Sequence, residues 1–245
     1  MNVIEIFSSI DGEGSRQGFL TTFLRLYDCN IRCSYCDTKY SYGPDSVYKE
    51  MFVQEVADTI ESLGNHRITI TGGEPLLQER EVIALIDELT RRSESSESCV
   101  SEREDEIYSH DTMPYDFNIE TNGTIVPSFQ RDNVWFTYDY KTPSSLAEKS
   151  MNLDIFKAAT ERDLIKFVVG TPEDLDCMRH ILAAHMTEAH IYVSPVWGQI
   201  EATSIIEYMK AHNLQNVRFQ LQIHKFIWDP DAKGGVVWTR KKSNH

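Results

Sequence analysis

Residues 21–36, TTFLRLYDCNIRCSYC, join a predicted strand to a loop that carries three cysteines. The first seven residues are apolar or β-branched except for one arginine, which is typical of a buried strand. Cys29, Cys33 and Cys36 follow within eight residues, spaced by four and three positions. A strand that runs into metal-binding side chains is typical of α/β proteins, whose sites form at the carboxyl ends of parallel strands.

Strands and helices alternate along the rest of the chain. Short apolar runs predict further strands at residues 3–7, 67–71, 117–120, 134–138, 164–169, 191–194 and 217–222. Helical spacing of apolar residues predicts one helix through Phe52, Val56, Ile60 and Leu63, another through Val82, Leu85, Ile86 and Leu89, and two more at 172–185 and 201–212. The alternation predicts an α/β fold with a parallel sheet. With about six βα units, the sheet is expected to form an incomplete TIM-type barrel.

Polar motifs follow several of these strands. They are the cysteines after 21–27, GGEP at 72–75, TNG at 121–123, KTP at 141–143 and QIHK at 222–225. Because the carboxyl ends of parallel strands meet at one edge of a sheet, we expect a single site there.

Composition indicates an ordinary globular protein, and the length suits one large domain or two small ones. We expect a single domain, residues 1–245. Hydrophobic residues make up 41% and charged residues 25%. The net charge of −14 would repel a phosphate backbone, so nucleic acid is not an expected partner. No apolar run approaches the length of a membrane span, and the first residues lack the pattern of a signal peptide. We therefore expect a cytoplasmic protein without a membrane partner.

Two segments fall outside the α/β pattern. Residues 93–110 contain six serines and six acidic residues with one arginine, so residues 93–116 are predicted to be a loosely held acidic insert. Residues 229–245 are predicted to be a polar C-terminal tail. Cys99 lies in the insert and is not expected to be a ligand.

The three clustered cysteines allow more than one interpretation. Five cysteines in a chain without an export signal argue against a disulfide framework and for ligand or catalytic thiolates. A 4Fe–4S cluster held by three of them would keep one iron open to a non-protein ligand. Structural zinc would need a fourth ligand, and inert buried thiols are a third possibility. The residues alone leave these alternatives open.

The spacing Cys-x3-Cys-x2-Cys resembles the cluster motif of the radical S-adenosylmethionine (SAM) superfamily. Residues 71–75, TGGEP, are similar to its Gly-Gly-Glu-Pro motif, which contacts the amino group of the methionine moiety, and two glycines let a backbone approach a ligand closely. The resemblance implies a partial barrel of the radical SAM type. It also implies a 4Fe–4S cluster whose open iron is chelated by SAM.

A closer resemblance is to the 7-carboxy-7-deazaguanine synthase family, and it extends to about Trp228. It is carried by DGEG at 11–14, Arg25, CDT at 36–38, ETNG at 120–123 and QIHK at 222–225. The resemblance implies a lyase of queuosine and 7-deazapurine biosynthesis that converts 6-carboxy-5,6,7,8-tetrahydropterin to 7-carboxy-7-deazaguanine with loss of ammonia. It implies SAM, the cluster and Mg²⁺ as cofactors, an electron donor such as flavodoxin or ferredoxin, and a homodimer.

Carried over by position, the resemblance assigns a role to each site residue. Cys29, Cys33 and Cys36 would hold the cluster, and Thr38 would bind Mg²⁺. SAM would contact Tyr35, Cys36, Asp37, Gly73, Glu120, Thr121, Asn122, Asp139, Tyr140, Lys141 and Thr142. The match around residues 138–142 rests on Lys141 alone. The pterin would contact Ile10, Asp11, Gly12, Glu13, Arg25, Thr71 and His224.

Three of these residues have alternatives. Asp11 stands where the family commonly has Gln, and a shorter acid could hold the pterin edge differently. Arg25 lies in an apolar strand, so it needs an anionic partner, either the substrate or a protein acid such as Glu13. His224 could equally be a core histidine.

Two other functions share some of these features. An activase that generates a glycyl radical on a partner protein would use the cysteine motif and SAM, but it has no need of the DGEG turn or the His-Lys motif. A zinc-binding module without enzymatic activity would need only the cysteines. Metal analysis separates the second case from the first.

Overall fold

The computed structural model describes residues 1–97 and 114–229, apart from the side chains of residues 96 and 97. The strands are β1 (Asn2–Ile10), β2 (Leu20–Leu26), β3 (Lys49–Glu50), β4 (Arg67–Gly72), β5 (Asp116–Thr121), β6 (Val134–Tyr140), β7 (Leu164–Val169), β8 (His190–Pro195) and β9 (Val217–Phe219). The helices are α1 (Val53–Ser62), α2 (Glu79–Glu97), α3 (Ile155–Ala158), α4 (Pro172–Ala184), α5 (Ala202–Ala211) and α6 (His224–Ile227).

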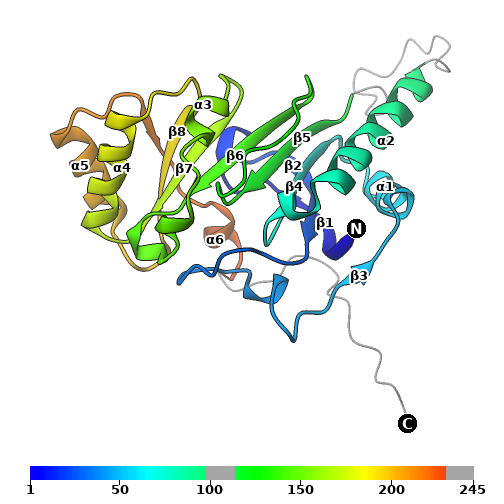
Figure 1. Cartoon of the computed structure of the whole chain (residues 1–245), viewed down its shortest axis with the longest axis horizontal. Coiled ribbons are helices and arrows are strands. Elements are labelled where there is room, and N and C mark those ends of the chain that lie inside the picture. Colours follow the sequence, from blue (N-terminus) through cyan, green and yellow to red (C-terminus); the bar gives the residue numbers. More distant parts are fainter. Residues whose placement is uncertain (98–113, 230–245) are drawn as a thin grey trace.

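The described strands form one sheet in the order β3-β1-β2-β4-β5-β6-β7-β8-β9. All neighbours from β2 onward are parallel, as the sequence predicts. The order begins at β3 and ends at β9, and these two edge strands are not paired with each other among the described residues. The sheet is therefore an incomplete barrel (Figure 1). The predicted fold class is confirmed in this arrangement.

The first strand differs from the prediction of a parallel sheet. β1 runs antiparallel to β2 and pairs Ile10 with Leu20, the first residue of β2. The turn that carries residues 11–14 therefore enters the barrel from the end opposite to the cysteine loop. This reversal lets two distant motifs approach the same interior from opposite ends.

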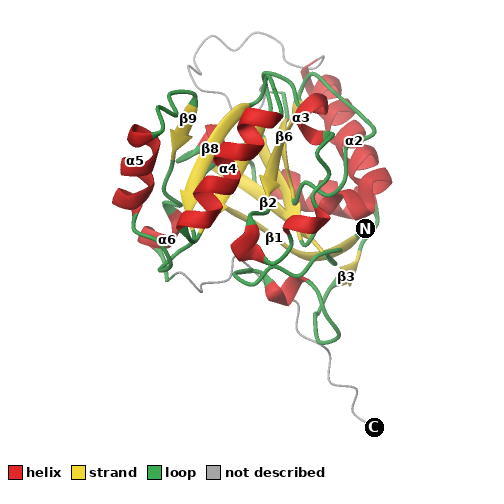
Figure 2. Ribbon diagram, turned by 60° about the vertical axis from the view of Figure 1, so that its left-hand side comes forward, coloured by secondary structure: helices red, strands yellow, loops and turns green. Residues whose placement is uncertain are grey.

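Helices cover the outer face of the sheet. In Figure 1, α1 and α2 lie beside the half formed by β1, β2, β4 and β5, and α4 and α5 lie beside β7 and β8. In Figure 2, α4 crosses in front of the sheet. The predicted stripe of α2, namely Val82, Leu85, Ile86 and Leu89, is buried throughout. These apolar faces are the main source of stability, because burial removes apolar area from water.

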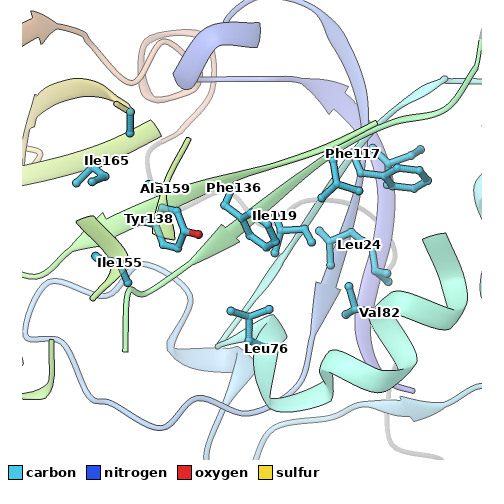
Figure 3. Packing of buried hydrophobic residues seen from close by; sticks show 14 of the residues in the cluster. Leu24, Leu76, Val82, Phe117, Ile119, Phe136, Tyr138, Ile155, Ala159 and Ile165 are labelled. Atoms are coloured by element: carbon cyan, nitrogen blue, oxygen red, sulfur yellow. The ribbon is translucent and has the colours of Figure 1, made fainter. Parts of the chain in front are cut away.

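The core between sheet and helices is continuous. Figure 3 shows Leu24 and Phe117 of the strands on the same side as Val82 of α2, with Phe136 and Tyr138 of β6 farther along the same layer. Aromatic rings fill the region near β6, where Phe136 stacks on Tyr138 with centroids 5.7 Å apart.

Some predicted boundaries are wrong. α2 extends to Glu97, so the first residues of the predicted acidic insert are helical. At its other end, Tyr115 is buried in the core and Asp116 begins β5. Residues 98–113 of the insert, including Cys99, and residues 230–245 of the tail lie outside the described residues.

Two predicted elements also differ in detail. Phe52, predicted to lie on the apolar face of the first helix, precedes α1 and is 77% exposed. The buried face of α1 includes Ala57 instead. β9 ends at Phe219 rather than at residue 222, and α6 follows it. The residues between them turn inward to contact the site.

Arg16 closes the amino end of the barrel. Its guanidinium donates to the carbonyl oxygens of Ile68 and Asp116, which lie at the starts of β4 and β5, and stacks 4.0 Å from the ring centroid of Trp135. Burial lowers the pKa of Arg16 to about 10. These contacts fix the turn whose other residues face the cavity.

No helix among residues 1–97 and 114–229 combines the length and the apolar character that a bilayer span requires.

Candidate active site

A cavity of about 540 Å³ lies inside the barrel and extends to the carboxyl ends of its parallel strands. Five neighbouring strands each contribute a polar side chain: Arg25, Thr71, Glu120, Asp139 and Lys166. The register places Arg25 beside Thr71 and Asp139 beside Lys166, so these residues point to the same face of the sheet.

Strand alternation explains which residues reach the cavity. In β6, Thr137 and Asp139 line it, whereas Tyr138 and Tyr140 belong to the apolar core on the other face. Successive side chains of a strand point to opposite faces, so polar and aromatic residues alternate here. In β6, the polar residues Thr137 and Asp139, two positions apart among aromatic residues, mark the face that points into the barrel.

The cysteine loop covers the carboxyl end of the barrel. Cys29, Cys33 and Cys36 all line the cavity. The loop is anchored across the barrel, because the amide of Ser34 donates to the carbonyl of Ser145 at 2.9 Å. The hydroxyl of Tyr35 donates to the carbonyl of Val168, in β7, at 3.3 Å. These bonds hold the three thiols over the cavity.

Gly73 allows the turn after β4 to pack against this loop. A Cβ at residue 73 would lie 1.9 Å from the carbonyl oxygen of Asp28 and 2.8 Å from Cβ of Cys29. Only glycine permits this approach.

Glu74 ties the same turn to the end of β5. Its fully buried carboxylate accepts bonds from the amides of Leu76 and Asn122 and from the hydroxyl of Thr121, at 2.7–3.0 Å. Burial raises its pKa, which these donors oppose. Glu74 therefore has a structural role in the GGEP segment and does not line the cavity.

The turn at residues 10–13 forms the opposite wall. Asp11 is buried and accepts a bond from the hydroxyl of Thr69 at 3.1 Å. Desolvation raises the pKa of Asp11 to about 6, although Arg16 and Thr69 favour the charged form.

Gly12 is the contact point between this turn and α6. A Cβ at residue 12 would lie 1.9 Å from Nδ1 of His224, and the amide of Ile223 donates to the carbonyl of Gly12 at 3.0 Å. His224 is thereby held against the turn. Burial lowers its pKa, which favours the neutral imidazole.

Arg25 pairs with a protein acid. Its Nε lies 2.7 Å from Oε1 of Glu5, which also accepts a bond from the hydroxyl of Tyr40. The Glu5 side chain is fully buried and that of Arg25 is 14% exposed. The acid is Glu5 and not Glu13, the partner considered from the sequence. Among the described residues, the terminal nitrogens of Arg25 donate no hydrogen bond to the protein.

Glu13 instead pairs with Lys166. Nζ of Lys166 lies 2.7 Å from Oε1 of Glu13 and 3.7 Å from Oδ2 of Asp139. Nζ of Lys141 lies 2.8 Å from the same Asp139 oxygen. The cavity thus has a mixed lining in which each buried cation faces a carboxylate.

Comparisons with known proteins agree with this geometry. A model of the radical SAM superfamily matches residues 25–152. The 7-carboxy-7-deazaguanine synthase of Clostridium acetobutylicum is 36% identical over 95% of this chain and 98% of its own length. The one from Methanospirillum hungatei is 35% identical over 94% of this chain and 86% of its own length. The chain belongs to the 7-carboxy-7-deazaguanine synthase family.

A solved structure shows the same fold. The crystal structure of QueE from Escherichia coli superimposes with a TM-score of 0.68, covering 90% of this chain and 92% of that chain at 21% identity. The partial barrel of the radical SAM type is therefore confirmed as the architecture of this member of the 7-carboxy-7-deazaguanine synthase family.

Most of the site residues that the family resemblance predicts line the cavity inside the barrel. The group comprises Ile10, Asp11, Gly12, Glu13, Arg25, Cys29, Cys33, Tyr35, Cys36, Asp37, Thr38, Thr71, Gly73, Glu120, Thr121, Asn122, Asp139, Lys141 and His224. Tyr140 and Thr142 do not line it. Tyr140 is 2% exposed and packs against Phe167 and Phe156, and the Thr142 hydroxyl donates to the carbonyl of Val168.

The cavity fits the cofactors of the radical SAM superfamily. Within residues 1–97 and 114–229, no group of three His, Cys, Asp or Glu side chains converges enough to hold a single metal ion. The thiols of a 4Fe–4S cluster bind different irons, so three thiols on one wall and the close backbone at Gly73 suit a cluster. Oδ1 of Asp139 is buried with no partner in the described part of the chain, which suits a donor from a bound cofactor.

Burial disfavours the thiolate form of two of the three cysteines. Burial raises the pKa of Cys33 to about 11 and raises that of Cys29 as well. Cluster assembly would therefore release protons, because iron binds thiolates.

Sequence reasoning missed several cavity residues. They include Tyr40, Tyr42, Lys166 and Trp197. The signal for Lys166 was present, because it is the one charged residue in the apolar stretch LIKFVV. A lysine there must find an acidic partner. Lys225 lies 3.4 Å from Asp37 and, with Arg25, lowers the pKa of Asp37 against the effect of burial.

Proposed function

We propose that this chain converts 6-carboxy-5,6,7,8-tetrahydropterin to 7-carboxy-7-deazaguanine with loss of ammonia, in 7-deazapurine and queuosine biosynthesis. The observation that carries the proposal is the meeting of two motifs in one cavity. The three cysteines and Gly73 form one wall, and the turn at residues 10–13 forms another. A family of close sequence relatives with this activity supports the same reaction.

The cofactor side of the cavity has the chemistry that the reaction needs. Cys29, Cys33 and Cys36 would hold the 4Fe–4S cluster. SAM would lie between Gly73, Asn122 and the segment at residues 139–141. When bound, the cluster and SAM supply the hydrogen abstraction from C6 of the pterin. The protein positions the reactants and limits the access of water and oxygen.

The substrate side provides complementary charges. The terminal nitrogens of Arg25 suit the pterin carboxylate, because a guanidinium donates two parallel bonds to a carboxylate. Glu5 holds the other side of the guanidinium through Nε and so fixes the direction of the fork. The carboxylate of Glu13 and the neutral ring of His224 face the rest of the substrate.

Mg²⁺ is part of the proposal through Thr38. Its hydroxyl lies 3.6 Å from Sγ of Cys36 on the cavity wall, close to the thiols. A hard cation prefers oxygen ligands, so a hydroxyl and the substrate carboxylate suit it better than a thiolate does. Because the protein offers this site a neutral ligand, binding of Mg²⁺ is expected to depend on the substrate.

The surroundings of the enzyme are also proposals. Free thiols and a reducible cluster need a reducing compartment, which supports a cytoplasmic location. A flavodoxin or ferredoxin as electron donor and a homodimeric state rest on the family resemblance. A glycyl-radical activase has less support, because the tight contact between Gly12 and His224 serves a small-molecule pocket.

The test is turnover by the anaerobically reconstituted protein. The protein is loaded with iron and sulfide and incubated with SAM, dithionite, Mg²⁺ and 6-carboxy-5,6,7,8-tetrahydropterin. We expect 7-carboxy-7-deazaguanine and ammonia in equal amounts, with many turnovers per SAM. A loaded protein that cleaves SAM but leaves the pterin unchanged would contradict the proposal.

A further inference from the structure

Lys166 is an unusual residue for its place in the fold. It stands in the middle of β7, whose six residues are all buried, and its side chain is 7% exposed. A buried ammonium is costly unless an anion compensates it. Its side chain points into the cavity instead of the helix-covered core.

The contacts of Lys166 connect two parts of the site. Nζ donates to Oε1 of Glu13 at 2.7 Å, and Gln222 donates to the other oxygen of that carboxylate at 3.2 Å. On its other side Nζ lies 3.7 Å from Asp139, which Lys141 also contacts. The result is a continuous polar chain from the wall proposed for the pterin to the segment proposed for SAM.

A purely structural role explains this chain poorly. A buried ion pair adds little to stability compared with apolar residues of the same volume. Oδ1 of Asp139 also has no partner within residues 1–97 and 114–229, although it is buried. A network that keeps an unused acceptor at a cavity is arranged for a ligand.

Glu13 also faces other charged and titratable groups. Asp11 of the same turn and Glu120 of β5 are acidic, and desolvation raises the pKa of Glu120 to about 7. Asp139 of β6 is a further acid, and His224 of α6 is neutral when buried. Lys166 is the cation in direct contact with Glu13. Without it, Oε1 of Glu13 would lose its 2.7 Å bond to Nζ, and the carboxylate could turn about the remaining bond from Gln222.

We propose that Lys166 is a positioning residue that holds Glu13 oriented to accept the amino-pyrimidinone edge of the pterin. This edge presents an N–H and an exocyclic amino group side by side, which matches a carboxylate with two accepting oxygens. The proposal rests on the proposed function and adds the residue that fixes the direction of the Glu13 carboxylate on its substrate wall.

The first experiment compares Lys166→Met with Lys210→Met. Lys210 forms an exposed pair with Glu207 at 2.8 Å, so its variant is a matched control for the loss of one lysine. In K166M we expect the KM for the pterin to rise by about thirtyfold or more, the scale for removing one partner of a buried charge pair. The KM for SAM should change much less. K210M should match the wild type in both.

A double-mutant cycle separates positioning from structure. If Lys166 acts through its contact with Glu13, then K166M added to Glu13→Gln should weaken pterin binding by no more than about threefold beyond E13Q alone. The double variant has neither Lys166 nor Glu13, so no unpaired ion is left where the two residues met. It can therefore test the proposal even if K166M alone does not fold. Binding is measured by anaerobic equilibrium dialysis of the pterin, beside thermal melting of each variant.

The outcomes are distinct. A folded K166M with a pterin KM within threefold of wild type would overturn the proposal, as would full additivity in the cycle. A wild type that neither binds nor converts the pterin would instead overturn the proposed function. If the wild type converts the pterin and K166M has the same pterin KM, the proposed function is supported and only the role of Lys166 is contradicted.

Discussion

Arg25 lies between a protein acid and the cavity. Its Nε is bound to Glu5, and its side chain lines the cavity proposed for the substrate. From the sequence, an arginine in an apolar strand needs an anionic partner, but the sequence could not decide between the substrate and a protein acid. The register supplies the answer, because Glu5 of β1 stands directly opposite Arg25 of β2.

Arg25→Lys should destabilise the fold by about 2–4 kcal/mol, because a lysine cannot occupy the position of Nε and leaves Glu5 buried with one fewer donor. The KM for the pterin should rise as well, since an ammonium lacks the two-pronged donor. Urea unfolding and anaerobic kinetics measure the two effects. Arg91→Lys is the control, because Arg91 is largely exposed and should change stability by less than about 0.5 kcal/mol. A stable R25K would contradict the assigned pair.

Asp11 gives a prediction that depends on pH. Its folded-state pKa is raised to about 6, so between about pH 4 and pH 6 the folded state binds more protons than the unfolded state. Stability from this group therefore falls as pH rises through that window and stays low above it. Asp11→Asn keeps an acceptor for Thr69 but has no charge to desolvate.

The difference in unfolding free energy between D11N and wild type should be near zero at pH 4. It should grow to about 1–3 kcal/mol in favour of D11N above pH 6. Urea unfolding at a series of pH values measures it. A difference that stays constant with pH would mean that Asp11 is not desolvated in the folded protein.

Residue identity alone could not separate inward from outward positions. Asp139 and Lys141 line the cavity, but Tyr140 between them faces the core, because side chains alternate along β6. Lys166 lies on the inward face of β7 but belongs to no family motif, so the sequence comparison did not select it. When a family motif is carried over as a continuous segment, the alternation of side chains is ignored. The alternation can be assigned only when the strand boundaries are known.

At the scale of elements, the cysteine loop and the turn after β4 depend on one another. Gly73 lies against Asp28 and Cys29, and Glu74 connects the turn to the end of β5. The sequence placed the two motifs after successive predicted strands, and the register of β2 with β4 shows that these strands are neighbours. Their direct packing required the backbone path, which no periodicity reveals.

Gly73→Ala should reduce bound iron at least severalfold, because its Cβ would push the cysteine loop away from β4. Gly64→Ala is the control. A Cβ at Gly64 meets open space, although φ is +72°, so this variant adds backbone strain without a clash. Iron and sulfide analysis after reconstitution measures the effect. Equal iron in both variants would contradict the close packing at Gly73.

The turn at residues 11–14 shows the limit of prediction for elements. The sequence indicated a turn between two strands, and its polar residues were expected to join the site. Because β1 is antiparallel to β2, the turn approaches from the amino end of the barrel, where Arg16 anchors it. Antiparallel pairing of the first strand was not encoded in the alternation of strands and helices that predicted the rest.

For the whole molecule, the metal that the three cysteines bind distinguishes a cluster enzyme from a zinc module. Replacing Cys29, Cys33 or Cys36 by Ala should remove most bound iron and abolish SAM cleavage. Cys177→Ala should retain both, because that thiol lies on α4 and donates to Glu148. Metal analysis and 5′-deoxyadenosine formation measure the outcome. Stoichiometric zinc in the anaerobic wild type would contradict a cluster site.

The central claim is that the three cysteines leave one iron open to SAM inside the cavity that also binds the pterin. The most direct test is electron paramagnetic resonance of the reduced, reconstituted protein, recorded before and after SAM is added. We predict a reduced 4Fe–4S signal whose g values shift on addition of SAM, since SAM would become a ligand of the open iron. A signal that saturating SAM leaves unchanged, or no cluster signal at all, would contradict the account.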